Sequence, residues 1–173
     1  LFSLSPDVFV VTQFGIITSR EEFLEALKRK RINVDDARAV ERLCSSCGDV
    51  GVSARSNQTV KREGEKLEDV QISGTTANMA VLSNLDLEAG RLFVDSEVDK
   101  AAPLAVIGSD VRGELFGQLD PVGRLVWIEG SPFNVIRLLR KQGAVLSRNQ
   151  DKQVFMPLGT FRKQFGTRRS LTL

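Results

Sequence analysis

The 173 residues of this chain are enough for one domain or two small lobes, and 42% hydrophobic with 27% charged residues is typical of a folded globular protein. The net charge of +2 is too small to indicate a nucleic-acid partner. Histidine, the commonest general base and metal ligand, is absent, and no apolar stretch approaches the roughly 20 residues of a membrane-spanning helix. We therefore expect no catalytic residues, metal ligands or cofactor in this domain.

The first part of the chain predicts a strand followed by a helix. Val8–Val11 is rich in β-branched residues and predicts the strand. Ser19 and Glu22 have the spacing of a capping box, and the apolar residues that follow at helical spacing are Phe23, Leu24 and Leu27. We interpret the basic run Lys28–Arg31 as a solvated helix end, where the helix dipole favours positive charge.

A second helix and three strands are predicted next. The helix starts at Asn33, with acidic residues in its first turn, and should bury Ala37, Val40 and Leu43. The strands are expected at 50–56, 58–62 and 67–73, and residues 62–65 supply the hairpin turn between the last two.

Beyond Gly74 the sequence predicts alternating short helices and strands. The helices are one through Met79 and Leu82, one from a Ser109 cap to Gly117, and one carrying Leu158, Phe161 and Phe165 that ends at Gly166. The strands are expected at 104–107, 125–128, 133–139 and 154–156, the middle two joined across 130–132. We therefore expect an α+β fold with two lobes, a βαβ-rich one at 1–74 and a mixed one at 75–166.

The second half of the chain contains a spaced set of short, different motifs. They are Gly90-Arg91-Leu92-Phe93, Ala105-Val106-Ile107-Gly108, Glu114-Leu115-Phe116-Gly117, Asp120-Pro121-Val122-Gly123, Phe133-Asn134-Val135-Ile136 and Val154-Phe155-Met156-Pro157-Leu158. The set resembles the extracytoplasmic domain of MacB-like (FtsX-like) ABC transporter permeases. The resemblance implies a porter-like lobe at 1–74 with a truncated closing segment at 167–173, and an inserted lobe at 75–166.

The resemblance also implies a function without an active site. Such a domain couples cytoplasmic ATP hydrolysis to export or lipoprotein release by docking a partner and moving as a rigid lobe. It would lie on the periplasmic side of the inner membrane, and its partners would be a second permease copy, an ATP-binding subunit or domain, and a periplasmic adaptor or lipoprotein carrier. No glycine precedes a lysine in the sequence, so the phosphate-binding loop of an ATPase would lie elsewhere. The chain lacks a starting methionine, and we expect it to be part of a longer, membrane-anchored protein.

The pair Cys44 and Cys47 has several interpretations. A redox pair would place the first cysteine at a helix N-terminus, whereas here the pair follows a predicted helix end. A zinc site would need further ligands that the chain lacks. A structural disulfide fits the extracytoplasmic domain that the resemblance implies, and two ordinary buried thiols remain as the alternative.

Four basic residues are candidates for contact with a partner. Arg137 stands where the family usually has a glycine; without it we expect a straighter strand, in which Arg137 and Arg140 either face a partner or are simply exposed. Arg148 and Lys152 lie in a polar stretch that predicts an exposed loop.

Two other functions compete with the permease domain. The first is a periplasmic binding module that holds a small ligand between its lobes. The second is a small secreted hydrolase that uses carboxylates or the pair Ser96 and Lys100, a spacing too common to be informative.

Overall fold

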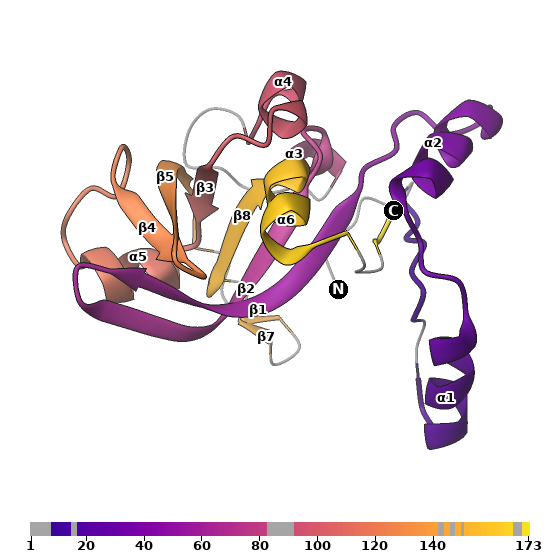
Figure 1. The fold of residues 1–173 in the computed structure, drawn as a ribbon, viewed down its shortest axis with the longest axis horizontal. Helices are drawn as coiled ribbons and strands as arrows, with labels where there is room; N and C mark the ends of the chain where they lie inside the picture. Colours follow the sequence, from indigo (N-terminus) through magenta and orange to yellow (C-terminus); the bar gives the residue numbers. More distant parts are fainter. Residues whose placement is uncertain are drawn as a thin grey trace.

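Six strands close into a barrel in the order β1-β2-β8-β3-β5-β4 (Figure 1). The computed structural model describes residues 8–14, 17–82, 92–141, 144–145, 148–149, 151–167 and 171–173. The barrel strands are β1 (Ser53–Arg62), β2 (Glu65–Thr75), β3 (Leu104–Ile107), β4 (Leu125–Ile128), β5 (Ser131–Leu138) and β8 (Gln153–Pro157). A separate two-stranded sheet consists of β6 (Ala144–Val145) and β7 (Arg148–Asn149).

Six helices accompany the strands in the described residues, so the chain is an α+β protein as predicted. They are α1 (Arg20–Lys28), α2 (Val34–Leu43), α3 (Met79–Leu82), α4 (Asp95–Asp99), α5 (Ser109–Phe116) and α6 (Leu158–Phe165). α5 and α6 pack against the barrel, whereas α1 and α2 lie to one side of it (Figure 1). None of these helices has the length and hydrophobicity that crossing a lipid bilayer requires.

Local caps start α1 and α2 where the sequence predicts. The Ser19 hydroxyl accepts a hydrogen bond from the Glu22 amide, and the Asn33 side chain accepts from the Asp35 and Asp36 amides. The predicted burial of one face of α2 is confirmed at Ala37 and partly met at Val40, which is half-buried. Leu43, predicted to be buried, is 83% exposed.

The N-terminal segment does not form the predicted strand at Val8–Val11. Residues 8–11 have no regular secondary structure; Thr12 forms a β-bridge with Thr172, and Val11 and Leu173 exchange two backbone hydrogen bonds. The strands predicted at 50–56 and 58–62 merge into β1, which has an irregularity between Gln58 and Val60. The predicted hairpin turn is present, and its central residues Glu63 and Gly64 both have positive φ.

The barrel includes strands from both sides of the boundary predicted at residue 74. β2 runs parallel to β8, β1 pairs with β4, and residue 74 itself lies within β2. The strand pairing gives no support to a break at that point. The division into lobes at 1–74, 75–166 and 167–173 stays a prediction.

β5 contains a bulge where a straighter strand was expected. Ala105 pairs with Val135, but Val106 pairs with Arg137, so Ile136 is the extra residue. The expectation was wrong because a bulge can form from residues at negative φ and does not need glycine.

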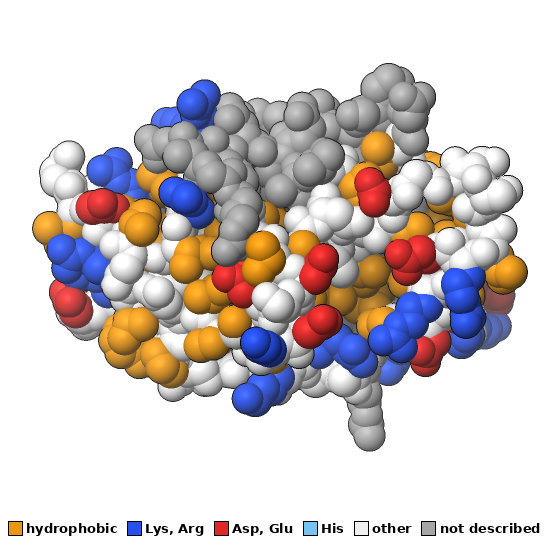
Figure 2. All heavy atoms as spheres, turned by 90° about the horizontal axis from the view of Figure 1, so that it is seen from above, with side chains coloured by type: hydrophobic (Ala, Val, Ile, Leu, Met, Phe, Trp, Pro, Cys, Tyr) orange, Lys and Arg blue, Asp and Glu red, His pale blue; other side chains and the backbone are white. Residues whose placement is uncertain are grey.

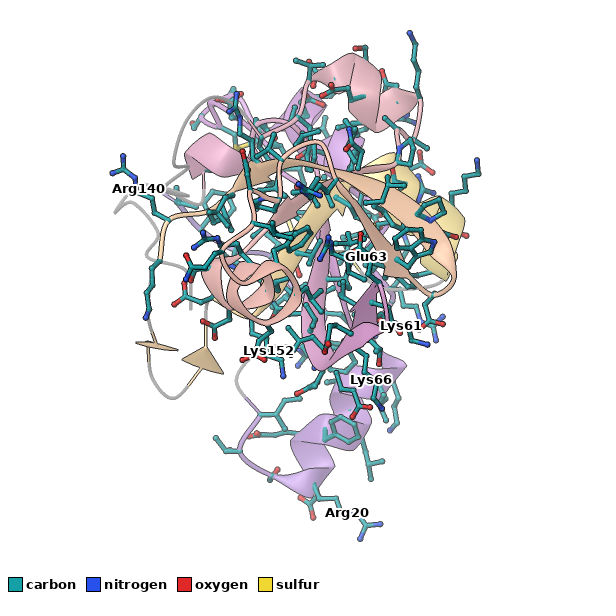
Figure 3. All side chains as sticks on the ribbon, turned by 90° about the vertical axis from the view of Figure 1, so that its left-hand side faces the viewer. Arg20, Lys61, Glu63, Lys66, Arg140 and Lys152 are labelled. Carbon is teal, nitrogen blue, oxygen red and sulfur yellow. A yellow bond between two sulfur atoms is a disulfide. The ribbon has the colours of Figure 1, made fainter. Side chains whose placement is uncertain are left out.

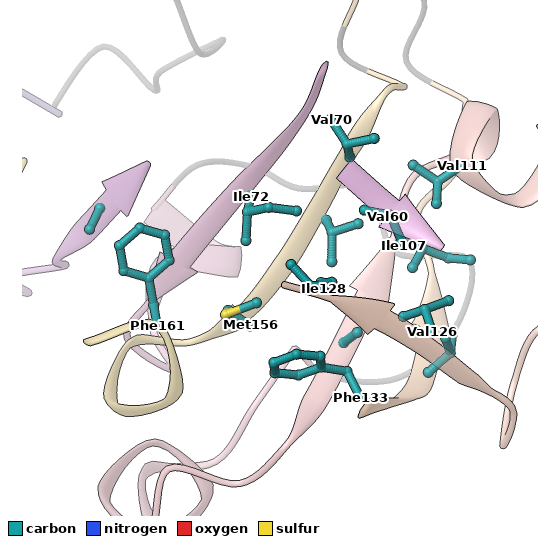
Figure 4. Close-up of a cluster of buried hydrophobic side chains, with 14 of the residues drawn as sticks. Val60, Val70, Ile72, Ile107, Val111, Val126, Ile128, Phe133, Met156 and Phe161 are labelled. Atoms are coloured by element: carbon teal, nitrogen blue, oxygen red, sulfur yellow. The ribbon is translucent and has the colours of Figure 1, made fainter. Parts of the chain in front are cut away.

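Apolar side chains from the barrel strands meet in its interior, and residues of α5 and α6, with Ala37 of α2, complete the core (Figure 4). Phe133 of β5 and Met156 of β8 are buried, and Phe161 of α6 lies directly over Gly74, whose position leaves no room for a Cβ atom. α5 contributes its predicted apolar face and ends at Gly117, although its N-cap residue is Gly108 and not Ser109.

Candidate partner-binding surface

The four basic residues predicted to contact a partner do not form one cluster. Arg137 is half-buried in β5, and Arg140 lies exposed just beyond the end of that strand. Arg140 points away from the barrel at one edge of the molecule, whereas Lys152 lies near Lys66 (Figure 3). Arg148 belongs to β7, and its side chain lies outside the described part of the structure.

Lys152 lies beside the β1–β2 hairpin. Its carbonyl oxygen accepts a hydrogen bond of 3.2 Å from the Gln71 amide of β2. The Lys66 ammonium group donates to Glu68 at 2.8 Å, and this bond lowers the pKa of Glu68 and raises that of Lys66. The positive charge of Lys152 adds to the lowering of the Glu68 pKa. Lys66 therefore holds the Glu68 carboxylate in an ion pair, and Lys152 acts on it only through its charge.

An open groove of about 700 Å³, the hairpin groove, lies next to this cluster. It is lined by β1, the β1–β2 turn, β2 and the β4–β5 turn, including Lys61, Glu63, Lys66, Glu68, Trp127 and Glu129. Trp127 is 38% exposed and pairs with Lys61 across the strands. Exposed tryptophan beside cations is a frequent centre of protein–protein contact.

The sequence analysis did not identify Trp127 as a surface residue. β4 alternates strictly, with Leu125 and Trp127 facing outward and Val126 and Ile128 facing inward. This two-residue period is visible in the sequence and could have placed Trp127 on the surface.

Both walls of the hairpin groove are attached to helices. Arg62, only 7% exposed, donates a hydrogen bond of 3.0 Å to the carbonyl oxygen of Leu115 in α5. On the other wall, the Gln164 amide of α6 reaches the carbonyl oxygen of Glu129 at 3.4 Å, and the Ser131 hydroxyl donates to the Gln164 side chain at 3.0 Å. The groove is therefore part of the stiff barrel and not of a separate loop.

Charges of both signs are interspersed with hydrophobic side chains on the face seen in Figure 2. Recognition on that face therefore depends on local clusters and not on a field of one sign. Within the described residues, no three potential ligands among histidine, cysteine, aspartate and glutamate lie close enough together to hold a metal ion.

A second, apolar pocket of about 370 Å³ lies where the first and last described segments meet. Its lining includes Phe9, Val11, Val40, Met79, Leu82 and Leu173. Cys47, at its rim, is joined to Cys44 in a disulfide, the bond that the sequence analysis favoured. The disulfide closes the end of α2, where the Cys44 amide still donates to the Val40 carbonyl oxygen.

Comparison with known proteins finds a family that matches the whole chain and relatives that match about two thirds or more of it. The family described as MacB-like periplasmic core domain matches residues 1–173. The macrolide export ATP-binding/permease protein MacB of Rhodospirillum rubrum is 34% identical over 127 residues, which are 72% of this chain and 19% of that protein. The uncharacterized ABC transporter permease YknZ of Bacillus subtilis is 28% identical over 116 residues, 67% of this chain and 29% of that protein. The chain thus spans less than a third of the length of these relatives.

Solved structures share the fold. The periplasmic region of MacB from Actinobacillus actinomycetemcomitans superposes with a TM-score of 0.74 at 17% identity, covering 94% of this chain and 71% of that one. The extracellular domain of the ABC-type transporter YknZ from Gram-positive bacteria gives a TM-score of 0.69 at 22% identity, covering 82% and 72%. At these identities the likeness concerns the fold alone.

Proposed function

Because this chain belongs to the family of MacB-like periplasmic core domains, we propose that it acts as the coupling and docking module of an ABC transporter permease. The domain lies on the periplasmic side of the inner membrane and is anchored there by the full-length protein. ATP is hydrolysed on a separate segment or subunit in the cytoplasm. The domain passes the resulting movement to a partner as a rigid lobe, and the outcome is export or lipoprotein release.

The observation that carries this proposal is the attachment of the hairpin groove to a closed barrel. A lobe that transmits movement must be stiff, and a surface that a partner grips must move with it. Arg62 and Gln164 fasten the two walls of the groove to α5 and α6, so a force applied to the groove reaches the whole barrel.

The chemistry of this surface indicates the character of the partner. Trp127 offers an apolar contact in a groove whose lining carries charges of both signs, and Lys152 adds a positive charge beside Glu68. A periplasmic adaptor or lipoprotein carrier that presents an apolar side chain flanked by charged groups would fit. In the full transporter a second permease copy and the ATP-binding component complete the assembly, with Arg137, Arg140 and Arg148 as further candidate contacts.

The proposal is tested in the full-length permease with its ATP-binding component. Charge reversal at Arg148 and Lys152 together is expected to lower capture of an acidic partner at low salt about tenfold, because rim charges govern encounter. Trp127→Ala is expected to do the same without altering the circular dichroism spectrum. Lys163→Glu, on exposed helix α6 surface, serves as the control. Unchanged capture and unchanged coupling of transport to ATP hydrolysis in both variants would refute the proposal.

The apolar pocket supports a second candidate, a periplasmic module that binds a small ligand. Its volume of about 370 Å³ falls within the roughly 300–1,000 Å³ of small-molecule sites. Val40→Trp would fill the pocket, and fluorescence titration of an apolar naphthalene-sulfonate dye should then show weakened binding. Dye binding that is equal in the two proteins would exclude this pocket.

A further inference from the structure

The hairpin groove places a cation and a carboxylate on adjacent sides of an exposed indole. Lys61 of β1 lies directly opposite Trp127 of β4 in the strand register. Glu129 follows Trp127 by two residues, in the turn between β4 and β5, and lines the same groove. All three side chains are exposed, so a partner in the groove meets an apolar surface with one positive and one negative neighbour.

The other charges that line the groove are paired within the chain. Four side chains form two ion pairs, Arg62 with Glu63 at 2.7 Å and Lys66 with Glu68 at 2.8 Å. Among the residues that the structure describes, the side chains of Lys61 and Glu129 have no ion-pair or hydrogen-bond partner. Their two charges are therefore the ones that remain for a partner.

The strand register puts Lys61 in an unfavourable place. Lys66 of β2 lies directly opposite it and carries the same charge, and like charges at such positions destabilise a strand pair. Lys66 is compensated by Glu68, whereas Lys61 has no carboxylate partner in the described ranges. A carboxylate from a partner would relieve this repulsion, so binding gains a stabilisation that the chain alone does not realise.

The groove lies far from the place where the ends of the described chain meet. Thr172 bridges to both Thr12 and Ser53, and Ser53 is the first residue of β1. Lys61 is eight residues further along this strand, which is roughly 26 Å at about 3.3 Å per residue. Figure 1 shows the β1–β2 turn at one end of the barrel and the C-terminal end of the chain beyond the other. The groove is therefore separate from the surface that the chain ends share.

The size of the groove favours a short segment over a second copy of the chain. Ten residues line it, whereas each side of a stable protein–protein interface contributes about 20–30. Its volume of about 700 Å³ is instead in the range of sites that enclose small ligands. A few residues of a partner chain would fill such a groove.

We propose that the hairpin groove binds a short extended segment of a protein partner whose apolar side chain is flanked by one acidic and one basic side chain. The apolar side chain packs on Trp127, the carboxylate pairs with Lys61 and the cation pairs with Glu129. Side chains on one face of an extended segment recur at every second residue, about 6.6–6.8 Å apart. The long side chains of Lys61 and Glu129 reach across that spacing. The inference rests on the proposed function, because it specifies the partner that the permease docks.

Trp127 is the single tryptophan of the chain, so its fluorescence reports on the groove. The 173-residue chain is titrated with three capped pentapeptides, Asp-Ser-Leu-Ser-Lys, Asp-Ser-Leu-Ser-Asp and Lys-Ser-Leu-Ser-Lys. They share the apolar residue and differ only in their flanking charges. We expect the mixed peptide to bind about tenfold more tightly than either of the other two, because only it satisfies both charges. Equal binding, or no change in the Trp127 emission with any of them, would overturn the inference.

Charge reversal in the groove should switch this preference. Lys61→Glu leaves two carboxylates beside Trp127, and this variant should prefer the dibasic peptide about tenfold over the mixed one. Glu129→Lys should prefer the diacidic peptide by a similar factor. Lys100→Glu, the same change at an exposed lysine after α4, is the matched control and should keep the parent's preference. A switched order of affinities cannot arise from misfolding, and its absence in either groove variant contradicts the inference.

Two further measurements would identify a different occupant. Self-association of the chain in sedimentation velocity that Lys61→Glu abolishes would assign the groove to a second copy. Protection of Lys61 from acetylation in the full-length permease without its partner, read by mass spectrometry, would show that the rest of that protein covers the groove. Either result would overturn the inference. Partner capture that Trp127→Ala lowers, with no charge preference among the peptides, would remove this inference and leave the proposed function in place.

Discussion

The guanidinium carbon of Arg62 lies 4.7 Å from the centroid of the Phe116 ring. Arg62 ends β1 and Phe116 ends α5, so the contact joins two elements that are distant in sequence. Arg62 also forms an ion pair of 2.7 Å with Glu63 and a hydrogen bond with the Leu115 carbonyl oxygen. One buried side chain thus donates a hydrogen bond to a carbonyl group near the end of a helix, forms a cation–π contact with an aromatic ring and pairs with a neighbouring carboxylate.

Arg62→Ala should destabilise the barrel by about 2–4 kcal/mol, because it leaves a buried carbonyl group without its donor and opens space against Phe116. Chemical denaturation followed by circular dichroism measures the loss. Lys61→Ala, the exposed neighbour on the same strand, should leave the midpoint nearly unchanged. A similar small loss in both variants would show that the Arg62 contacts contribute little.

Two glycines five residues apart should respond to alanine with opposite signs. A Cβ atom on Gly108 would collide with the backbone oxygen of Asp151, which cannot turn aside, so Gly108→Ala should cost about 2–4 kcal/mol. Nothing lies within 4 Å of a Cβ on Gly113, in the middle of α5, and Gly113→Ala should stabilise by about 0.5–1 kcal/mol. Thermal unfolding of the two variants compares them directly, and a stable Gly108→Ala protein would contradict the close approach.

The disulfide of Cys44 and Cys47 closes a very short loop, so it should stabilise by only about 1–3 kcal/mol. The double variant Cys44→Ser with Cys47→Ser should lower the free energy of unfolding by that amount, measured by chemical denaturation. Electrospray mass spectrometry should show a gain of two hydrogens on reduction. Two free thiols in the protein before reduction would instead favour the interpretation as ordinary cysteines.

Acidification should loosen the starts of α1 and α2 before the barrel unfolds. The Thr18 amide and hydroxyl hold the pKa of Glu22 below its usual 4.5, and Lys30 with the Asn33 amide holds that of Asp36 below 3.8. Because these pKa values are lower in the folded state, the carboxylates stabilise the caps above their usual pKa and lose that contribution as pH falls through the folded value.

Amide hydrogen exchange by NMR reports this change at Thr18 and Asn33. Protection at Thr18 should decline below about pH 4.5, the ordinary value for glutamate. Glu22→Gln should show a lower and pH-independent protection there while leaving Asn33 unaffected. Protection at Thr18 that persists unchanged through this range in the parent protein would contradict the assigned bond.

Elements defined by local chemistry were predictable from the sequence. Ser19 and Asn33 start helices because their side chains bind amides two or three residues away, and Gly117 and Gly166 end helices because they adopt positive φ. The family motifs likewise indicated the correct family, which the match over the whole chain establishes.

Features that depend on distant partners were not predictable. The parallel pairing of β2 with β8 joins Ile72 to Val154, and no local pattern specifies such a register. The hydrophobic spacing of α1 indicated an amphipathic helix correctly but could not say whether its face is covered. The approach of Lys152 to the Lys66–Glu68 pair depends on the same long-range pairing, so the candidate surface could not be assembled from sequence.

The place of β8 in the barrel has a consequence for biogenesis. β8 lies between β2 and β3, so without residues 153–157 the β1–β2 hairpin and the β3–β5–β4 sheet share only the two residue pairs of β1 with β4. A nascent chain interrupted before Gln153 therefore contains two sheets with open edges, which favour aggregation. The barrel can close only after residues 153–157 have been synthesised, and until then those edges are a target for quality control.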